Sequence, residues 1–132
     1  MQGWRATRAD IDLEAIVRNV QAIRNTLLPC TEIMAVVKAD GYGHGAIEVA
    51  KCALSVGATR IGVALIEEAI ELRRAGIGVP IHVLGVVSSV GCEQVVKFGL
   101  TATVVDMEFA KSLSAIATKA GRKANVHVKV DT

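Results

Sequence analysis

The sequence predicts an α/β fold built from repeated βα units. Short apolar segments rich in β-branched residues alternate with segments of helical periodicity, and the pattern recurs about every twenty residues. This alternation is typical of parallel strands joined by crossover helices. Five strands are expected, at 33–38, 60–65, 80–85, 100–105 and 125–130. Five helices are expected between or before them, at 13–27, 45–56, 67–75, 89–98 and 107–120.

The boundaries of the first elements have chemical causes. Asp10 or Asp12 can cap the first helix, whose apolar residues recur at helical spacing until Pro29 ends it. Gly57 ends the second helix. The helix at 67–75 has acidic residues in its first turn and arginines in its last, which suits the helix dipole.

The boundaries of the later elements follow the same rules. Ser88 or Ser89 can cap the helix that ends at Phe98. Asp106 can cap the next helix, and Gly121 ends it.

Two architectures fit this order of elements: a five-stranded doubly wound sheet, or the first five strands of a (β/α)8 TIM-type barrel. In the last strand three valines alternate with polar residues, namely His127, Lys129 and Asp131. A central strand of a doubly wound sheet should be apolar on both faces, whereas a barrel strand can turn polar side chains inward. Lys38 shares a face of the first strand with Met34 and Val36. The alternation therefore favours the barrel, with Lys38 and Lys129 both pointing inward.

Length sets the expected domain organisation. A (β/α)8 barrel takes typically about 250 residues, and this chain has 132. We therefore expect an N-terminal fragment or one piece of a divided chain. Residues 1–12 would form a leading strand or arm, and residues 13–132 a partial, cofactor-binding barrel.

Composition argues against several classes of partner. Hydrophobic residues make up 52% of the chain and charged residues 21%, with a net charge of +2 and only 3% aromatic residues. This balance gives no reason to expect nucleic acid or a membrane as a partner. The sequence shows no signal peptide and no apolar run of about 20 residues, and its three cysteines lack CxxC spacing. We expect a cytoplasmic protein with reduced thiols and no metal site.

The segment Ala35 to Gly45, AVVKADGYGHG, carries the candidate chemistry. It places Lys38 at the tip of an apolar strand, before three alternating glycines. An amine is nucleophilic only in its neutral form, which desolvation favours. Backbone N–H groups of a glycine-rich loop and the hydroxyl of Tyr42 can hold a phosphate. A primary amine beside a phosphate site suits pyridoxal 5'-phosphate. The alternative is a solvated lysine followed by an ordinary loop.

The same string closely resembles the cofactor-attachment segment of bacterial alanine racemases. The resemblance implies that Lys38 binds pyridoxal phosphate covalently and that Tyr42 hydrogen-bonds its phosphate. Asp40 and Gly41 differ from the commonest residues of the family, which are Asn and Ala. The likeness extends from about residue 4 to residue 132.

The resemblance implies a pyridoxal-phosphate-dependent isomerase that interconverts L- and D-alanine and supplies D-alanine for peptidoglycan. Family members join an eight-stranded barrel to a C-terminal β domain and act as homodimers. Residues 1–12 would pair with that C-terminal domain, which this chain lacks. Lys38 would be the catalytic base on one face of the substrate. A tyrosine of the partner subunit would serve the other face, so we expect the fragment alone to be inactive.

The resemblance suggests further site residues. Lys129 matches a lysine that carbon dioxide carbamylates in several family members, although an uncarbamylated lysine at the barrel mouth is the alternative. Val36 and Leu84 are expected to line the cofactor pocket, or else to be ordinary core residues. The histidines are expected to have structural roles: His44, His82 and His127.

Other functions remain open at this point. Another fold-type III pyridoxal-phosphate protein is one alternative: a serine racemase, an amino-acid decarboxylase or a cofactor carrier. Their loops after the lysine do not usually contain Tyr-Gly-His-Gly, which favours the racemases. A non-enzymatic, flavodoxin-like binding domain is the alternative of a different class.

Overall fold

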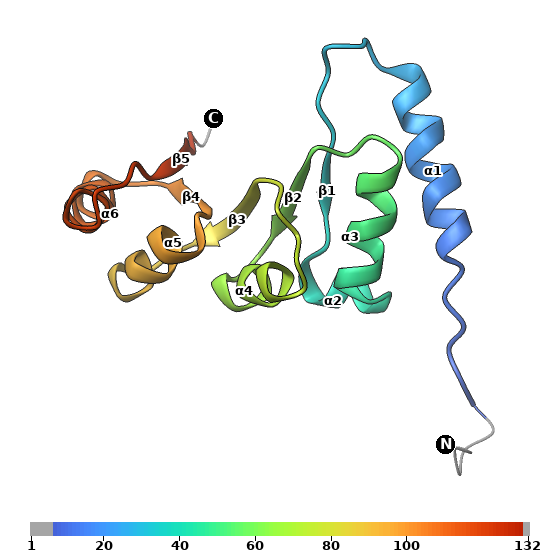
Figure 1. Ribbon diagram of the computed structural model, residues 1–132, viewed down its shortest axis with the longest axis horizontal. Helices are drawn as coiled ribbons and strands as arrows, with labels where there is room; N and C mark the ends of the chain where they lie inside the picture. The colour runs from blue at the N-terminus through green and yellow to red at the C-terminus, as the bar shows by residue number, and fades with distance from the viewer. Residues whose placement is uncertain (1–6, 131–132) are drawn as a thin grey trace.

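The computed structural model describes residues 7–130, which form one curved sheet of parallel strands with helices packed along its outer face (Figure 1). The strands are β1 Met34–Val36, β2 Arg60–Val63, β3 Ile81–Val86, β4 Thr101–Val104 and β5 Asn125–Val128. The helices are α1 Leu13–Thr26, α2 Lys38–Gly43, α3 Ala46–Ser55, α4 Ile66–Arg74, α5 Cys92–Phe98 and α6 Met107–Lys119. A short 3-10 helix, Ser89–Gly91, precedes α5. The expected α/β fold is confirmed.

The order of the strands decides between the two architectures. The sheet runs β1-β2-β3-β4-β5, and every neighbouring pair is parallel. A doubly wound sheet reverses its strand order at a switch point, whereas a barrel adds each strand on the same side as the one before. The flavodoxin-like alternative is therefore wrong, and the arrangement is the N-terminal part of a barrel.

The hydrophobic core lies between the sheet and the helices on its outer face. Outward-facing strand residues such as Ile61, Ile81 and Ala102 are fully buried against helix residues such as Leu72 and Leu113. The opposite, inner face carries the polar strand residues, in keeping with the period of two along each strand. Helix α1 lies beside α3 rather than on the sheet (Figure 1) and has no buried residue.

Several expected boundaries are confirmed. The Asp12 side chain accepts a hydrogen bond from the Ala15 N–H at 2.9 Å, so Asp12 rather than Asp10 caps α1. The Asp106 side chain caps α6 in the same way, at 2.7 Å from the Phe109 nitrogen. Val128 faces outward, toward the side of the sheet where α6 lies, as the alternation of the last strand predicted.

Other expectations were wrong or fall outside the described residues. Neither Ser88 nor Ser89 caps α5: the segment begins with a 3-10 turn, and the side chain of Ser88 makes no capping hydrogen bond. Residues 7–12 form no strand. The rest of the expected leading arm, and residues 131–132, lie outside the described part of the chain. No helix in the described part is long and apolar enough to cross a membrane.

Candidate active site

Lys38 stands just after the C-terminal end of β1. The N–H of Val37 donates to the Gly62 carbonyl at 2.8 Å, so the pairing with β2 continues one residue beyond β1. Val37 is buried in the core between the sheet and the helices, and Lys38, the first residue of α2, follows it directly. Lys38 is half-buried, and its Nζ lies 5.9 Å from the centre of the exposed Tyr42 ring.

The segment after Lys38, expected as a glycine-rich loop, is a left-handed turn. Ala39, Asp40, Gly41 and Tyr42 have φ values of 50°, 52°, 62° and 56°. This conformation costs a non-glycine residue roughly 1–2 kcal/mol. Three of the four residues are not glycine, so strain is concentrated directly beside Lys38.

Backbone hydrogen bonds offset this strain. The Gly41 N–H donates to the Val37 carbonyl at 2.8 Å, and the Gly45 N–H donates to the Asp40 carbonyl at 2.9 Å. The Asp40 carboxylate accepts from the Ala46 N–H at 2.8 Å, which caps the start of α3. Asp40 thus closes the turn with its backbone and begins the next helix with its side chain.

Two side chains complete the support of the turn. The Nδ1 of His44 lies 3.1 Å from the carbonyl oxygens of both Gly41 and Tyr42. Carbonyls only accept, so Nδ1 carries the proton and donates, which is a structural role. The Glu68 carboxylate, from α4, accepts from the Ala39 N–H at 2.6 Å.

An apolar wall lies on the inner face next to Lys38. A Cβ built on Gly62 would lie 3.3 Å from both Val36 Cγ2 and Leu84 Cδ1, and 3.1 Å from Met34 Sδ. These three side chains therefore meet over the bare backbone of Gly62. Val36 remains partly exposed there, so the wall presents apolar surface to the interior of the half-barrel.

A polar cluster occupies the inner face of β3 to β5. The hydroxyl of Thr103 donates to the Val83 carbonyl at 2.8 Å, so it must accept from His82 Nε2 at 2.9 Å. His82 is thus the Nε2–H tautomer, and its buried Nδ1 has no hydrogen-bond partner within residues 7–130. Burial, with a smaller contribution from the charge of His127, lowers the pKa of His82. The two histidine rings meet edge to face, with centroids 4.0 Å apart.

Lys129 is not brought near Lys38 in this structure. Its N–H donates to the Val104 carbonyl at 2.9 Å, which continues the pairing of β4 with β5. Because β1 and β5 are the two edges of the sheet, Lys38 and Lys129 lie at opposite ends of the strand order.

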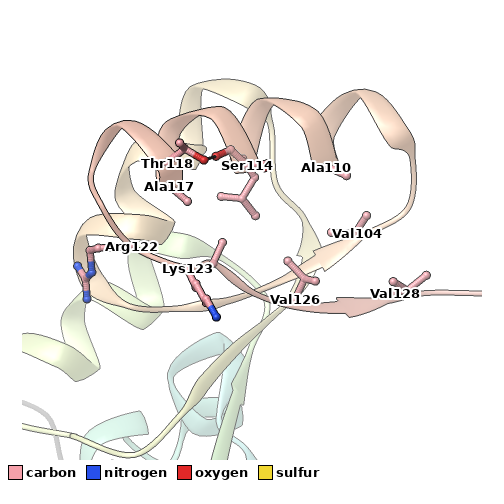
Figure 2. Close-up of a pocket in the computed structure, with 11 residues that line it drawn as sticks. Val104, Ala110, Ser114, Ala117, Thr118, Arg122, Lys123, Val126 and Val128 are labelled. Carbon is pink, nitrogen blue, oxygen red and sulfur yellow. Dashed lines mark hydrogen bonds between the residues drawn. The ribbon is translucent and has the colours of Figure 1, made fainter.

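A groove of about 440 Å³ lies away from these residues, between α6 and the outer face of β5 (Figure 2). Its walls are mainly apolar, including Leu113, Val126 and Val128, with Arg122 and Lys123 at one end. In a βα fold the outer face of a strand is covered by neighbouring helices, and among residues 7–130 only α6 lies on this side of β5. The groove is uncovered packing surface and is separate from the Lys38 site.

The chain is similar to known proteins over nearly its whole length. The family described as "Alanine racemase, N-terminal domain" matches residues 11–132. The chain belongs to this family.

Relatives of known name agree with the family assignment. Alanine racemase of Desulforamulus reducens is 52% identical over 94% of this chain and 34% of its own length. The crystal structure of alanine racemase from E. faecalis superimposes with a TM-score of 0.93 at 45% identity, covering 98% of this chain and 36% of that one. The chain thus spans about a third of the length of these alanine racemases.

A relative with a different name shares the fold. Histidine racemase from Leuconostoc mesenteroides subsp. sake superimposes with a TM-score of 0.79 at 31% identity, covering 88% of this chain and 31% of that one.

Alanine racemases imply pyridoxal phosphate, and the residues of this site fit this group. Lys38 would offer a primary amine to its aldehyde, and the nearby Tyr42 would offer a hydroxyl to its phosphate. Because Gly62 has no Cβ, the side chains of Val36 and Leu84 can meet above its backbone. Their apolar surface suits an aromatic ring. Among residues 7–130 no group of three or more His, Cys, Asp or Glu side chains is placed to hold a metal ion.

Sequence reasoning missed two of these features. Glu68 was one of several acidic residues at the start of a helix, and nothing local shows that it reaches a residue 29 positions away. Gly62 is a lone glycine inside a strand, a signal for close approach of another group that could have been used.

Proposed function

We propose that this chain is the cofactor-binding part of an alanine racemase, in which Lys38 carries pyridoxal phosphate and moves the substrate proton on one face. The observation that carries the proposal is the position of Lys38: half-buried at a strand end, followed by a strained left-handed turn. The C-terminal end of the strands is where barrel enzymes bind their substrates.

Each neighbouring residue has a role in this proposal. Tyr42 hydrogen-bonds the phosphate of the cofactor, and Val36 and Leu84 form the apolar wall beside its ring. When bound, pyridoxal phosphate supplies an electron sink for the charge left on the substrate Cα after proton loss. Lys38 would accept or return the substrate proton on its own face.

Inversion of a stereocentre requires a second base on the opposite face. No residue of this chain matches the partner tyrosine that the resemblance assigns to that role, so racemisation needs the full-length homodimer. The leading residues 1–12 would then pair with the C-terminal β domain. Supply of D-alanine for peptidoglycan in the cytoplasm follows as the cellular role.

Substitution of Lys38 in the full-length gene product tests the proposal. Each variant is mixed with pyridoxal phosphate and reduced with borohydride, and the adduct is mapped by peptide mass. We expect a single adduct at Lys38 in the unchanged protein, and loss of both adduct and racemisation in Lys38→Ala. Lys51→Ala is the matched control, because Lys51 is an exposed lysine that pairs with Glu48 at 3.2 Å on α3. A Lys38→Ala protein that still attached cofactor and racemised alanine would refute the proposal.

Substrate and reaction type are tested in the same protein. With alanine in D2O, a racemase incorporates deuterium at Cα and forms the opposite enantiomer, whereas a decarboxylase releases carbon dioxide and a carrier does neither. Alanine is the proposed substrate because of the identity with alanine racemases, and a panel with serine and histidine measures the preference. A higher kcat/KM for serine or histidine than for alanine would contradict it.

We also propose that Lys129 is carbamylated in the full-length protein. Lys129 follows the C-terminal end of β5, as Lys38 follows the C-terminal end of β1, although the two strands lie at opposite sides of the sheet. A carbamate would give it a negative charge able to orient an arginine. A carbamate signal in 13C NMR with labelled bicarbonate should appear in the unchanged protein and vanish in Lys129→Ala. Its absence from the unchanged protein would exclude the modification.

A further inference from the structure

The Glu68 carboxylate joins two loops at the C-terminal edge of the sheet. Its Oε2 accepts from the N–H groups of Ala64 and Leu65, at 2.8 and 3.0 Å, in the loop between β2 and α4. Its Oε1 accepts from the N–H of Ala39 at 2.6 Å, in the turn that follows Lys38. One side chain therefore connects the start of its own helix to the candidate catalytic segment.

We propose that Glu68 is a positioning residue that sets the direction in which Lys38 leaves β1. The inference rests on the proposed role of Lys38. The N–H of Ala39 belongs to the same peptide plane as the carbonyl of Lys38. Holding that N–H to Glu68 fixes the plane, and with it the ψ angle of Lys38. The Lys38 backbone is then held on both sides, because the carbonyl of Val37, in the preceding peptide plane, accepts from the Gly41 N–H at 2.8 Å.

The bond is needed because Ala39 is the first residue of the left-handed turn. The first N–H groups of such a turn have no partner within it, and Ala39 is held at a φ of 50° that non-glycine residues rarely adopt. A carboxylate has two oxygens that only accept, so it can serve donors on two sides at once.

If Glu68 only capped its own helix, one of its two carboxylate oxygens would be enough. A glutamate at the third position of a helix commonly accepts from the N–H of its own capping residue. For Glu68 that residue is Leu65, and Oε2 makes this bond. The Oε1 contact with Ala39 adds nothing to α4, and it reaches the turn beside the reactive amine.

Three substitutions in the full-length protein separate the two roles. Glu68→Gln keeps the length of the side chain but has only one acceptor oxygen. Its NH2 group would therefore face a backbone N–H donor on one of the two sides, and that hydrogen bond would be lost. Glu68→Asp keeps the charge and can still cap α4, but it is one methylene shorter and loses the reach to Ala39. Glu67→Gln is the matched control, since Glu67 is exposed in the same first turn and makes the same change in charge near the helix start.

The measurements are amide hydrogen exchange of the peptide covering 38–45, the fraction of Lys38 labelled by pyridoxal phosphate and borohydride, and kcat with KM. We expect Glu68→Gln and Glu68→Asp to speed exchange at Ala39, to spread label to other lysines, and to lower kcat about tenfold or more. Glu67→Gln should leave all three unchanged.

The outcomes distinguish this inference from the proposed function. If Glu68→Asp folds and retains the exchange protection, the Lys38 labelling and the kcat of the unchanged protein, Glu68 only caps α4 and the inference is overturned. Glu68→Asp answers the question even where Glu68→Gln does not fold. Failure to label Lys38 in the unchanged protein would instead contradict the function of Lys38, whereas the exchange rate at Ala39 reports on Glu68 without any cofactor.

Discussion

At the N-terminal edge of the sheet arginines donate to backbone carbonyls, whereas at the C-terminal edge carboxylates accept from backbone N–H groups. In parallel βα units the helices begin at the C-terminal edge, where their first N–H groups need acceptors, and end at the other edge, where their last carbonyls need donors. The arginines are Arg24, Arg73 and Arg122. The carboxylates are Asp12, Asp40, Glu68 and Asp106.

The two edges differ in what this support achieves. At the N-terminal edge the helices end in glycines or ordinary turns, and the arginines hold the connections in place. At the C-terminal edge, hydrogen bonds to carboxylates help to hold three non-glycine residues at positive φ beside Lys38. One edge therefore uses its charged side chains for stability, and the other uses them to maintain a strained segment next to the candidate reactive group.

The largest effect on stability is expected from Arg73, at the N-terminal edge. Its guanidinium donates to the carbonyls of Ile77 and Val79 at 2.6 and 2.7 Å, and to those of Phe98 and Gly99 at 3.0 and 3.2 Å. Burial lowers the pKa of Arg73, because desolvation disfavours its charge. Arg73→Ala leaves four carbonyls without this donor and should lower the free energy of unfolding by about 2–4 kcal/mol.

Urea unfolding of Arg73→Ala beside Arg74→Ala measures this effect. Arg74 is exposed on the same helix turn, and its loss should cost less than about 0.5 kcal/mol. Arg73→Lys should recover little, since an ammonium cannot span four carbonyls in a planar fork. Equal midpoints for Arg73→Ala and Arg74→Ala would show that the edge does not depend on the arginine.

A smaller effect is expected from Asp40, at the C-terminal edge. Asp40→Ala removes the acceptor for Ala46 and places alanine at a φ of 52°, which Asp tolerates better. The free energy of unfolding should fall by about 1–2 kcal/mol. Asp40→Asn keeps a side-chain oxygen and the tolerance for this conformation, and should be close to neutral. Thermal unfolding of both variants checks this, and a large loss in Asp40→Asn would show that charge rather than conformation matters.

The same contrast explains how much of the fold and of the candidate site the sequence alone predicts. The order of elements, the caps at Asp12 and Asp106, and the inward and outward faces of β5 all depend on local patterns, and these expectations were confirmed. The Lys38 segment was located by its motif. Its left-handed turn was not predicted, because a run of glycines is compatible with many conformations.

Long-range contacts were the other limit. The bond from Glu68 to Ala39, and the meeting of Val36 with Leu84 over Gly62, join residues far apart in sequence. Only the register of β1, β2 and β3 brings them together, and no local pattern encodes it. Serine-capping of α5 failed for the opposite reason, since a locally suitable residue was bypassed by a 3-10 turn.

The smallest effect on stability is expected from His82, which lies between the two edges. One of its ring nitrogens donates to Thr103, and the other has no hydrogen-bond partner among residues 7–130. Because burial lowers the pKa of His82 in the folded state, the unfolded chain binds a proton first as pH falls. This residue therefore destabilises the fold as pH drops below about 6.5, by at most about 1.4 kcal/mol per pH unit.

His82→Gln keeps a donor for Thr103 but cannot titrate. Urea midpoints at pH 7.5 and 5.5 should fall less with acid in His82→Gln than in the unchanged protein. Identical falls would mean that the inner face accommodates a charged His82, and that protonation there is no obstacle to the fold.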